Sequence, residues 1–335
     1  MLAPANVLAC AVEESHFDRS IAVTFSVFLS ALCVSALAFS FDFQLSTFNS
    51  PPMPEGDTIF RAARTLHRAL ANQTVTAFES VFPKLERVEI DTPITGRTIE
   101  KVEANGKWML IHFSGGLILL THMLMSGSWH IYRPNEKWKR HRVHMRIVIH
   151  TQNFEAVAFN VPIAEFHTTD TLRRRQGFNQ LGPDVLAPEY NDAEILRRLR
   201  AHPDTETAEA LLTQSILAGI GNVFKSELCF SCNVNPFRKV STLSITELTC
   251  LVSTARKYLQ ANVTDNSGDQ IVTHTGLRRT TGRSEREENL WVYKRHNEPC
   301  RKCGTPIARR KQAPSARATF WCPTCQPLSP QPART

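Results

Sequence analysis

Hydrophobic and polar positions change their spacing along the chain. From Asp57, apolar residues recur every three or four positions, as on one face of a helix that Asp57 or Thr58 can cap. That face is formed by Ile59, Ala62, Ala63, Leu66 and Leu70. From Val75 to Phe159 the chain instead shows short β-rich runs broken by Gly, Pro and Asn. The pattern predicts a leading helix followed by a β-sandwich or barrel.

The helical spacing returns after Leu181-Gly182-Pro183-Asp184, where we place a domain boundary. The expected helices cover 193–200, 208–217, 223–230 and 245–261. The polar, basic stretch from Thr264 to Glu288 has the composition of a flexible connection, and residues 328–335 that of a disordered tail.

An apolar segment precedes all of these elements. Ile21 to Phe41 contains no charged residue and is long enough to span a bilayer, but its flanks are acidic, unlike those of a signal peptide or an inside-facing anchor. Two hypotheses follow for residues 1–52. Either translation begins at Met53 and this leader is absent from the mature protein, which we favour, or the leader is a targeting or membrane segment.

Composition is that of a folded protein with room for two domains, because 42% of the 335 residues are hydrophobic and 21% are charged. The net charge of +8 indicates a polyanionic partner such as nucleic acid, although a basic surface also occurs in proteins that bind none.

Four of the nine cysteines form the pattern Cys300-x2-Cys303-x18-Cys322-x2-Cys325. Each Cys-x2-Cys pair forms a tight turn that directs two thiolates toward one metal ion. Two such pairs supply all four ligands of a tetrahedral site, so the spacing predicts one structural zinc ion with no open position for chemistry. The alternative, two disulfides, needs an oxidising compartment.

The remaining cysteines and the histidines carry weaker signals. Cys229 and Cys232 lack a matching second pair, so we interpret them as buried, reduced thiols. Five histidines lie among Arg and Lys in the β-rich region, which favours a basic sheet surface over a metal site; they are His122, His130, His141, His144 and His150.

Three ordered motifs together resemble the Fpg/Nei family of DNA glycosylases, most closely its endonuclease VIII-like (Nei) branch. They are Pro54-Glu55-Gly56, the stretch Gln214 to Glu227 (QSILAGIGNVFKSE), and Arg317 to Cys322 (RATFWC). The resemblance extends from Met53 to about Gln326. The sequence departs from the family at Lys294 and Asn297, where glycine is frequent, and in its leader.

The resemblance implies an α+β fold. Residues 53–182 form a catalytic β-sandwich with a leading helix, 183–288 a helical DNA-binding domain with a helix-two-turn-helix, and 289–327 a zinc-ribbon hairpin.

The resemblance also implies the catalytic residues. Pro54 is the nucleophile, provided that it is the free N-terminus, because a secondary amine can form an iminium whereas a proline amide cannot. Glu55 is the general acid/base. Lys107 holds phosphates beside the damaged nucleotide.

The DNA-binding residues implied in the same way are Met125, Asn222, Lys225 and Arg317. Met125 is a wedge that fills the gap left by the extruded nucleotide, and Asn222 and Arg317 bind phosphate.

The sequence therefore predicts a bifunctional DNA glycosylase/AP lyase of base-excision repair that binds damaged double-stranded DNA as a monomer, in a bacterial cytoplasm. Oxidised pyrimidines are favoured as substrates, and oxidised purines such as 8-oxoguanine remain an alternative. If Pro54 stays blocked, the competing hypothesis is a zinc-containing protein that binds lesions without chemistry.

Overall fold

The structure is a computed structural model that describes residues 54–264, 280–281 and 288–328. The leader at 1–52, almost all of the connection at 264–288 and the tail from 329 lie outside the described residues, so the hypotheses about them stay predictions. None of the helices within the described ranges is long and apolar enough to cross a membrane.

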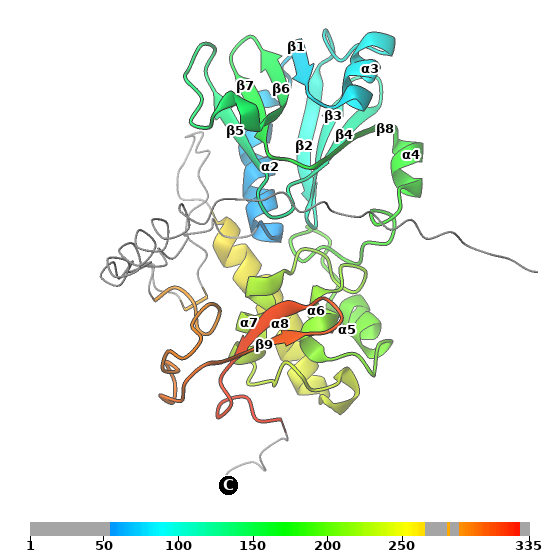
Figure 1. Ribbon diagram of the computed structural model, residues 1–335. Helices are drawn as coiled ribbons and strands as arrows, with labels where there is room; N and C mark the ends of the chain where they lie inside the picture. Colours follow the sequence, from blue (N-terminus) through cyan, green and yellow to red (C-terminus); the bar gives the residue numbers. More distant parts are fainter. Residues whose placement is uncertain (1–53, 265–279, 282–287, 329–335) are drawn as a thin grey trace, which may run out of the picture. The chain divides into compact units, whose positions relative to one another are not determined.

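The N-terminal half contains two antiparallel four-stranded sheets, ordered β1-β6-β7-β5 and β2-β3-β4-β8 (Figure 1). Its elements are α2 (Gly56–Leu70), β1 (Val75–Ser80), α3 (Pro83–Asp91), β2 (Ile99–Asn105), β3 (Trp108–Phe113), β4 (Leu117–His122), β5 (Ser128–Tyr132), η1 (Arg142–His144), β6 (Met145–Thr151), β7 (Glu155–Phe159) and β8 (Ile163–His167).

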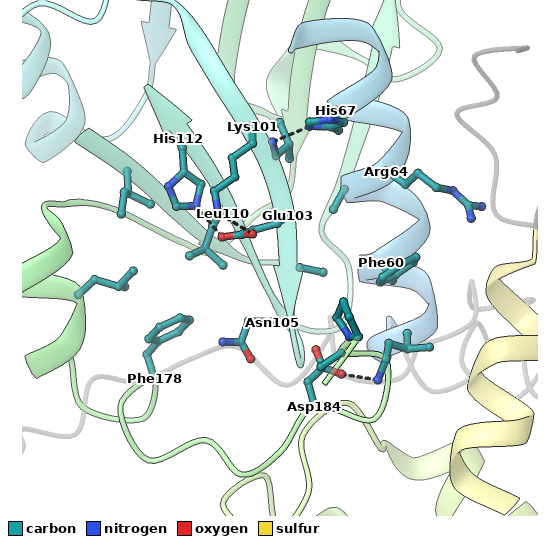
Figure 2. A pocket seen from close by; sticks show the side chains of 18 of the residues that line it. Phe60, Arg64, His67, Lys101, Glu103, Asn105, Leu110, His112, Phe178 and Asp184 are labelled. Atoms are coloured by element: carbon teal, nitrogen blue, oxygen red, sulfur yellow. Dashed lines mark hydrogen bonds and ion pairs between the residues drawn. The ribbon is translucent and has the colours of Figure 1, made fainter. Parts of the chain in front are cut away.

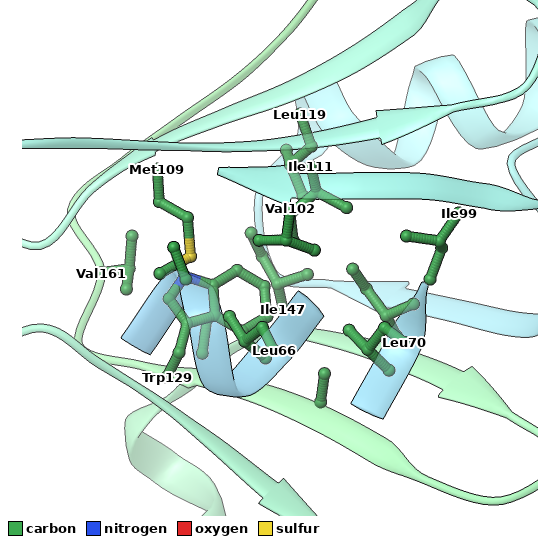
Figure 3. Packing of buried hydrophobic residues seen from close by; sticks show 14 of the residues in the cluster. Leu66, Leu70, Ile99, Val102, Met109, Ile111, Leu119, Trp129, Ile147 and Val161 are labelled. Carbon is green, nitrogen blue, oxygen red and sulfur yellow. The ribbon is translucent and has the colours of Figure 1, made fainter. Parts of the chain in front are cut away.

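One hydrophobic core joins both sheets to the leading helix. Leu66 of α2 packs among Met109 of β3, Trp129 of β5 and Ile147 of β6 (Figure 3). Fully burying a side chain of this kind stabilises the fold by about 2 kcal/mol relative to exposure. The predicted β-sandwich with a leading helix is confirmed.

Two local details differ from the sequence prediction. Helix α2 begins at Gly56 with Glu55 as an extended N-cap residue, not at Asp57 or Thr58, because the turn from Glu55 already has helical hydrogen bonding. Helix α3 was missed inside the β-rich region. It buries only Leu85 and therefore has little apolar periodicity to reveal it.

The C-terminal half is helical, as predicted. Its elements are α5 (Asp192–Arg200), α6 (Thr207–Leu212), α7 (Asn222–Ser231), η2 (Val240–Thr242) and α8 (Ile245–Val263). Helix α4 (Thr169–Arg174), which the sequence did not predict, belongs instead to the N-terminal half, because it contacts β8 and its Leu172 is buried with Trp108 and Ile118. The stretch expected to be helical over 208–217 ends early, at Leu212. Beyond it the Gln214 amide donates to the carbonyls of Leu212 (2.7 Å) and Ile220 (2.9 Å), which folds 213–221 into turns.

A disulfide between Cys232 and Cys250 corrects the interpretation of Cys232 as a reduced thiol. Cys232 ends α7 and Cys250 lies on α8, so the bond joins two helices that share one core. Cys229 is free and buried, as expected. The partner of Cys232 lies 18 residues away, outside any local motif.

The zinc-ribbon hairpin pairs β9 (Ala308–Gln312) with β10 (Arg317–Trp321). A single buried carboxylate connects this region to α7: Glu227 accepts the backbone N–H groups of Trp291, Val292 and Tyr293 at 2.8–2.9 Å. Three such bonds to one ionised group hold the approach to the hairpin against the helix.

Lys294 and Asn297, the two departures from glycine, both have a left-handed backbone, with φ of 62° and 65°. Asn tolerates this conformation because its short side chain bonds locally, whereas Lys has no such compensation.

Lys294→Gly is expected to stabilise the zinc-loaded protein by about 0.5–1 kcal/mol, since relief of the left-handed strain exceeds the entropy that glycine adds to the unfolded chain. The measurement is chemical denaturation at equilibrium. Asn297→Gly is the matched control and should gain less. A loss of stability in Lys294→Gly would contradict the strain argument.

Candidate active site

Glu55 is the centre of the candidate site. Its side chain is fully buried, and its carboxylate faces the first turn of α7. Oε1 accepts the N–H of Val223 at 2.7 Å, and Oε2 accepts that of Phe224 at 3.3 Å. Val223 and Phe224 are the second and third residues of α7, where the helix dipole favours an anion. Pro54, half-buried, is therefore adjacent to a fixed carboxylate.

Three glycines allow the chain near Glu55 to approach the turn before α7. The N–H of Gly56 donates to the carbonyl of Gly219 at 2.9 Å, and a Cβ on Gly56 would lie 2.8 Å from the Gly219 Cα. A Cβ on Gly221 would lie 2.3 Å from the carboxyl carbon of Glu55. Because these glycines have no Cβ, the Glu55 carboxylate can reach the turn before α7.

Asn222 is the first residue of α7, and its side chain is almost completely buried. Its Oδ1 has no hydrogen-bond partner in the described part of the chain. With this acceptor turned inward, the Nδ2 donor is the atom left to meet an anion beside the helix N-terminus.

Lys225 follows Asn222 by one turn of α7. Its side chain is 0% exposed, and its Nζ finds no hydrogen-bond partner among the described residues. Burial lowers the pKa of Lys225 to about 8, while the nearby charges of Glu209, Cys229 and Glu55 oppose this and Arg317 adds to it. The contact of Lys225 with DNA stays a prediction.

Arg317 is exposed at the start of β10, a strand that packs against α7. Because β10 packs against α7, the hairpin brings Arg317 to the helix that carries Asn222. Glu55, Asn222 and Arg317 thus come together from three distant parts of the sequence.

Lys107 lies in the two-residue turn between β2 and β3, where Asn105 pairs with Trp108. Gly106, the other turn residue, has a φ of +59°, and a Cβ there would lie 3.0 Å from the Cβ of Ala218. The turn therefore packs against the segment that leads into α7. This contact places Lys107 on the same side of the protein as Asn222.

The loop after β4 carries Met125, which is 55% exposed. His122 holds this loop, because its Nδ1 accepts the N–H of Leu124 at 3.0 Å. Burial and, to a smaller extent, the charges of Lys107 and Arg175 lower the pKa of His122 to about 4, so the ring is a neutral acceptor at pH 7. Because Trp108 pairs with His122, the turn that carries Lys107 and the loop that carries Met125 lie at neighbouring strand ends.

A pocket of about 950 Å³ lies beside α2 and β2 (Figure 2). Within it, Glu103 bonds His112 (2.8 Å) and Lys101 (2.9 Å), and these bonds lower the pKa of Glu103 to about 2. None of the predicted site residues lines this pocket. The candidate site therefore lies outside this pocket.

The four predicted zinc ligands form one cluster, with Sγ–Sγ separations of 3.8 Å between Cys300 and Cys325 and 3.4 Å between Cys303 and Cys322. Tetrahedral Zn–S bonds of about 2.3 Å require sulfur atoms about 3.8 Å apart. The cluster fits one structural zinc ion.

Comparison with known proteins identifies the class. Residues 53–162 match the family described as "Formamidopyrimidine-DNA glycosylase N-terminal domain", 181–273 its H2TH domain, and 297–328 the "Zinc finger found in FPG and IleRS". The chain belongs to the Fpg/endonuclease VIII family of DNA glycosylases, which confirms the resemblance seen in the sequence.

Individual relatives agree. "Probable endonuclease 8 2" of Streptomyces coelicolor is 39% identical over 82% of this chain and 94% of its own length. "DNA-(apurinic or apyrimidinic site) lyase Nei2" of Mycolicibacterium smegmatis is 34% identical over 83% and 100%. In fold, the chain is similar to Lactococcus lactis Fpg in a complex with DNA containing an abasic site, with a TM-score of 0.68 and 20% identity over 82% and 100%.

Gly221→Ala is expected to destabilise the protein by about 2 kcal/mol, because the new methyl group overlaps the Glu55 carboxyl group. Thermal and chemical unfolding measure the loss. In a Glu55→Ala background the same change should cost much less, since the overlapping group is gone. Equal costs in both backgrounds would contradict the proposed contact.

Cys322→Ser is expected to reduce bound zinc and unfold the hairpin, because a structural zinc site needs all four thiolates. Metal analysis and limited proteolysis measure these effects. Cys229→Ala, at a free cysteine outside the cluster, should retain full zinc. Unchanged zinc content in Cys322→Ser would contradict the ligand assignment.

Proposed function

We propose that this protein is a bifunctional DNA glycosylase/AP lyase of base-excision repair. The observation that carries the proposal is the Glu55 carboxylate, buried next to Pro54 and bound to two N–H groups at the start of α7. A fixed carboxylate beside a potential amine nucleophile supplies the acid/base pair that this chemistry needs. The names of the relatives, endonuclease 8 and AP lyase, support the same function.

Pro54 is the proposed nucleophile. Its nitrogen bonds to C1′ of the damaged nucleotide while the bond from C1′ to the base breaks, and the electron pair leaves with the base, which takes up a proton. The C1′–O4′ bond then opens and an iminium forms. Loss of a C2′ proton expels the 3′ phosphate with its electron pair and nicks the strand.

The proposed nucleophile requires a free secondary amine. Pro54 has one only if the mature chain begins there, after translation from Met53 and removal of that methionine. The match to the N-terminal domain family begins at residue 53, which supports this start.

Glu55 is the proposed general acid/base. It accepts the N–H proton that the Pro54 nitrogen loses after bonding to C1′, donates a proton to O4′ as the sugar ring opens, and accepts the C2′ proton during elimination.

Three side chains are proposed to contact phosphate: Lys107 at the β2–β3 turn, Asn222 at the start of α7 and Arg317 on the zinc hairpin. Met125, exposed on the loop after β4, is the proposed wedge that fills the space of the extruded nucleotide. The solved relative from Lactococcus lactis, bound to DNA with an abasic site, supports damaged double-stranded DNA as the partner.

Oxidised pyrimidines are the proposed substrates. The relatives named endonuclease 8 2 favour this branch, at 34–39% identity, whereas relatives named formamidopyrimidine-DNA glycosylase and the Escherichia coli relatives named endonuclease 8 are equally less similar, at 28–29%. Excision assays with an oxidised pyrimidine and with 8-oxoguanine in otherwise identical duplexes separate the two substrate classes.

Borohydride reduction in the presence of abasic DNA tests the mechanism. Protein shown by mass spectrometry to begin at Pro54 is expected to form a covalent adduct. Pro54→Gly should weaken base release, because a primary amine replaces the proline nitrogen. Glu55→Gln should lower it by at least about 100-fold, the range of general acid–base catalysis.

Both variants should retain most of their DNA affinity, measured on a duplex with a tetrahydrofuran abasic analogue. An equal loss of affinity and activity would contradict the catalytic roles. Absence of any adduct from protein that begins at Pro54 would instead favour a zinc-containing protein that binds lesions without chemistry.

A further inference from the structure

Asp184 lies between the sandwich and the helical half, where the sequence indicated only a domain boundary. Its two carboxylate oxygens have different partners. Oδ1 accepts the N–H of Leu186 at 2.8 Å, and Oδ2 accepts the N–H of Gly106 at 2.7 Å. The first bond is a local turn of a kind that aspartate often makes. The second reaches across 78 residues, and a local turn does not explain it.

Gly106 connects this carboxylate to Lys107, because the two residues form the β2–β3 turn. Pairing between Asn105 and Trp108 holds the two strands on either side of the turn, and the hydrogen bond to Asp184 holds Gly106 within it. Figure 2 shows Asp184 next to Asn105, the last residue of β2. The turn that carries Lys107 is therefore also held by a group outside the sheet.

The backbone of Asp184 is held in turn by the segment that leads into α7. Asp184 forms a parallel bridge with Ala218, whose N–H donates to the carbonyl of Pro183 at 2.9 Å. The next residue, Gly219, accepts the N–H of Gly56 at 2.9 Å. A series of hydrogen bonds thus connects the turn that carries Lys107, through Asp184 and the segment at Ala218 and Gly219, to Gly56, the residue after Glu55.

We propose that Asp184 is a positioning residue that sets the place of Lys107 relative to Glu55 and Asn222. This inference rests on the proposed function. A carboxylate that accepts two short N–H hydrogen bonds keeps the two segments that donate them at a fixed separation. A displacement of about 1 Å in a group that positions the substrate can lower the reaction rate about 100-fold.

The electrostatic setting of Asp184 agrees with this role. Burial raises the pKa of its carboxyl group, and the N–H groups of Gly106 and Leu186 oppose that rise. The bond to Gly106 therefore also helps to keep the buried carboxylate ionised.

The test compares Asp184→Ala and Asp184→Asn with wild type, all beginning at Pro54. Adduct formation with abasic DNA is followed in single turnover with borohydride, and affinity is measured on a tetrahydrofuran duplex. We expect Asp184→Ala to lower the adduct rate about 10- to 100-fold, with a much smaller change in affinity. Asp184→Asn preserves the volume and one acceptor, so it should fold and show a smaller loss.

A double-mutant cycle separates positioning from a general effect on stability. If Asp184 acts through the Lys107 turn, Asp184→Asn should cost little further rate in a Lys107→Ala background. Glu189→Gln, at an exposed carboxylate on the same segment, is the matched control and should behave like wild type.

The outcomes are distinguishable. Independent, additive losses from Asp184 and Lys107, or wild-type rates in both Asp184 variants, would overturn the positioning role while leaving the proposed function intact. A wild-type protein that begins at Pro54 and forms no adduct would overturn the proposed function, and the role of Asp184 with it.

Discussion

The structure depends above all on one buried carboxylate at a helix N-terminus. Glu55 reaches the first turn of α7 only because Gly221 has no Cβ and Gly56 lies against Gly219. The helix supplies two N–H donors and a favourable dipole, which offset the cost of burying a charge. This contact joins the start of the sandwich to the helical half and fixes the residue beside Pro54. The same atoms thus provide stability and the candidate chemistry.

A second buried carboxylate, that of Glu227, attaches the zinc-binding region to α7. Glu227 lies on α7, as do the N–H groups that bind Glu55, and it accepts three backbone N–H groups from the approach to the hairpin. Helix α7 is therefore the element to which the amino-terminal and zinc-binding parts both attach. A zinc ion stabilises the hairpin internally, whereas Glu227, together with the apolar contacts of Val223 and Phe230, holds the zinc region against α7.

The proposed DNA-contacting residues lie on tight turns and loops, with rigid strands and helices behind them. Lys107 occupies a two-residue turn, and Met125 lies on a loop that the neutral His122 ring holds by one hydrogen bond. Trp108 packs edge-on against His122 at 4.6 Å, and Arg175 lies 4.2 Å from the Trp108 ring. Such packing limits how far the loop can move, which suits a wedge that must enter a base stack in one orientation.

The sequence by itself determined the β-sandwich, most helix positions, the zinc ligands and the family, because these depend on local periodicity and short-range spacing. It could not show that Lys225 is buried or that Cys232 pairs with Cys250, since each depends on residues distant in sequence. The end of α6 at Leu212 was missed although its cause is local, because the Gln214 side chain bonds the nearby carbonyls of Leu212 and Ile220. Pro54 and Glu55 were found by their motif, but the partner of Glu55 lies 168 residues away. Only the tertiary structure decided that the N–H groups of Val223 and Phe224 bind this carboxylate. The reason is that a contact between distant segments produces no repeating pattern in a single sequence.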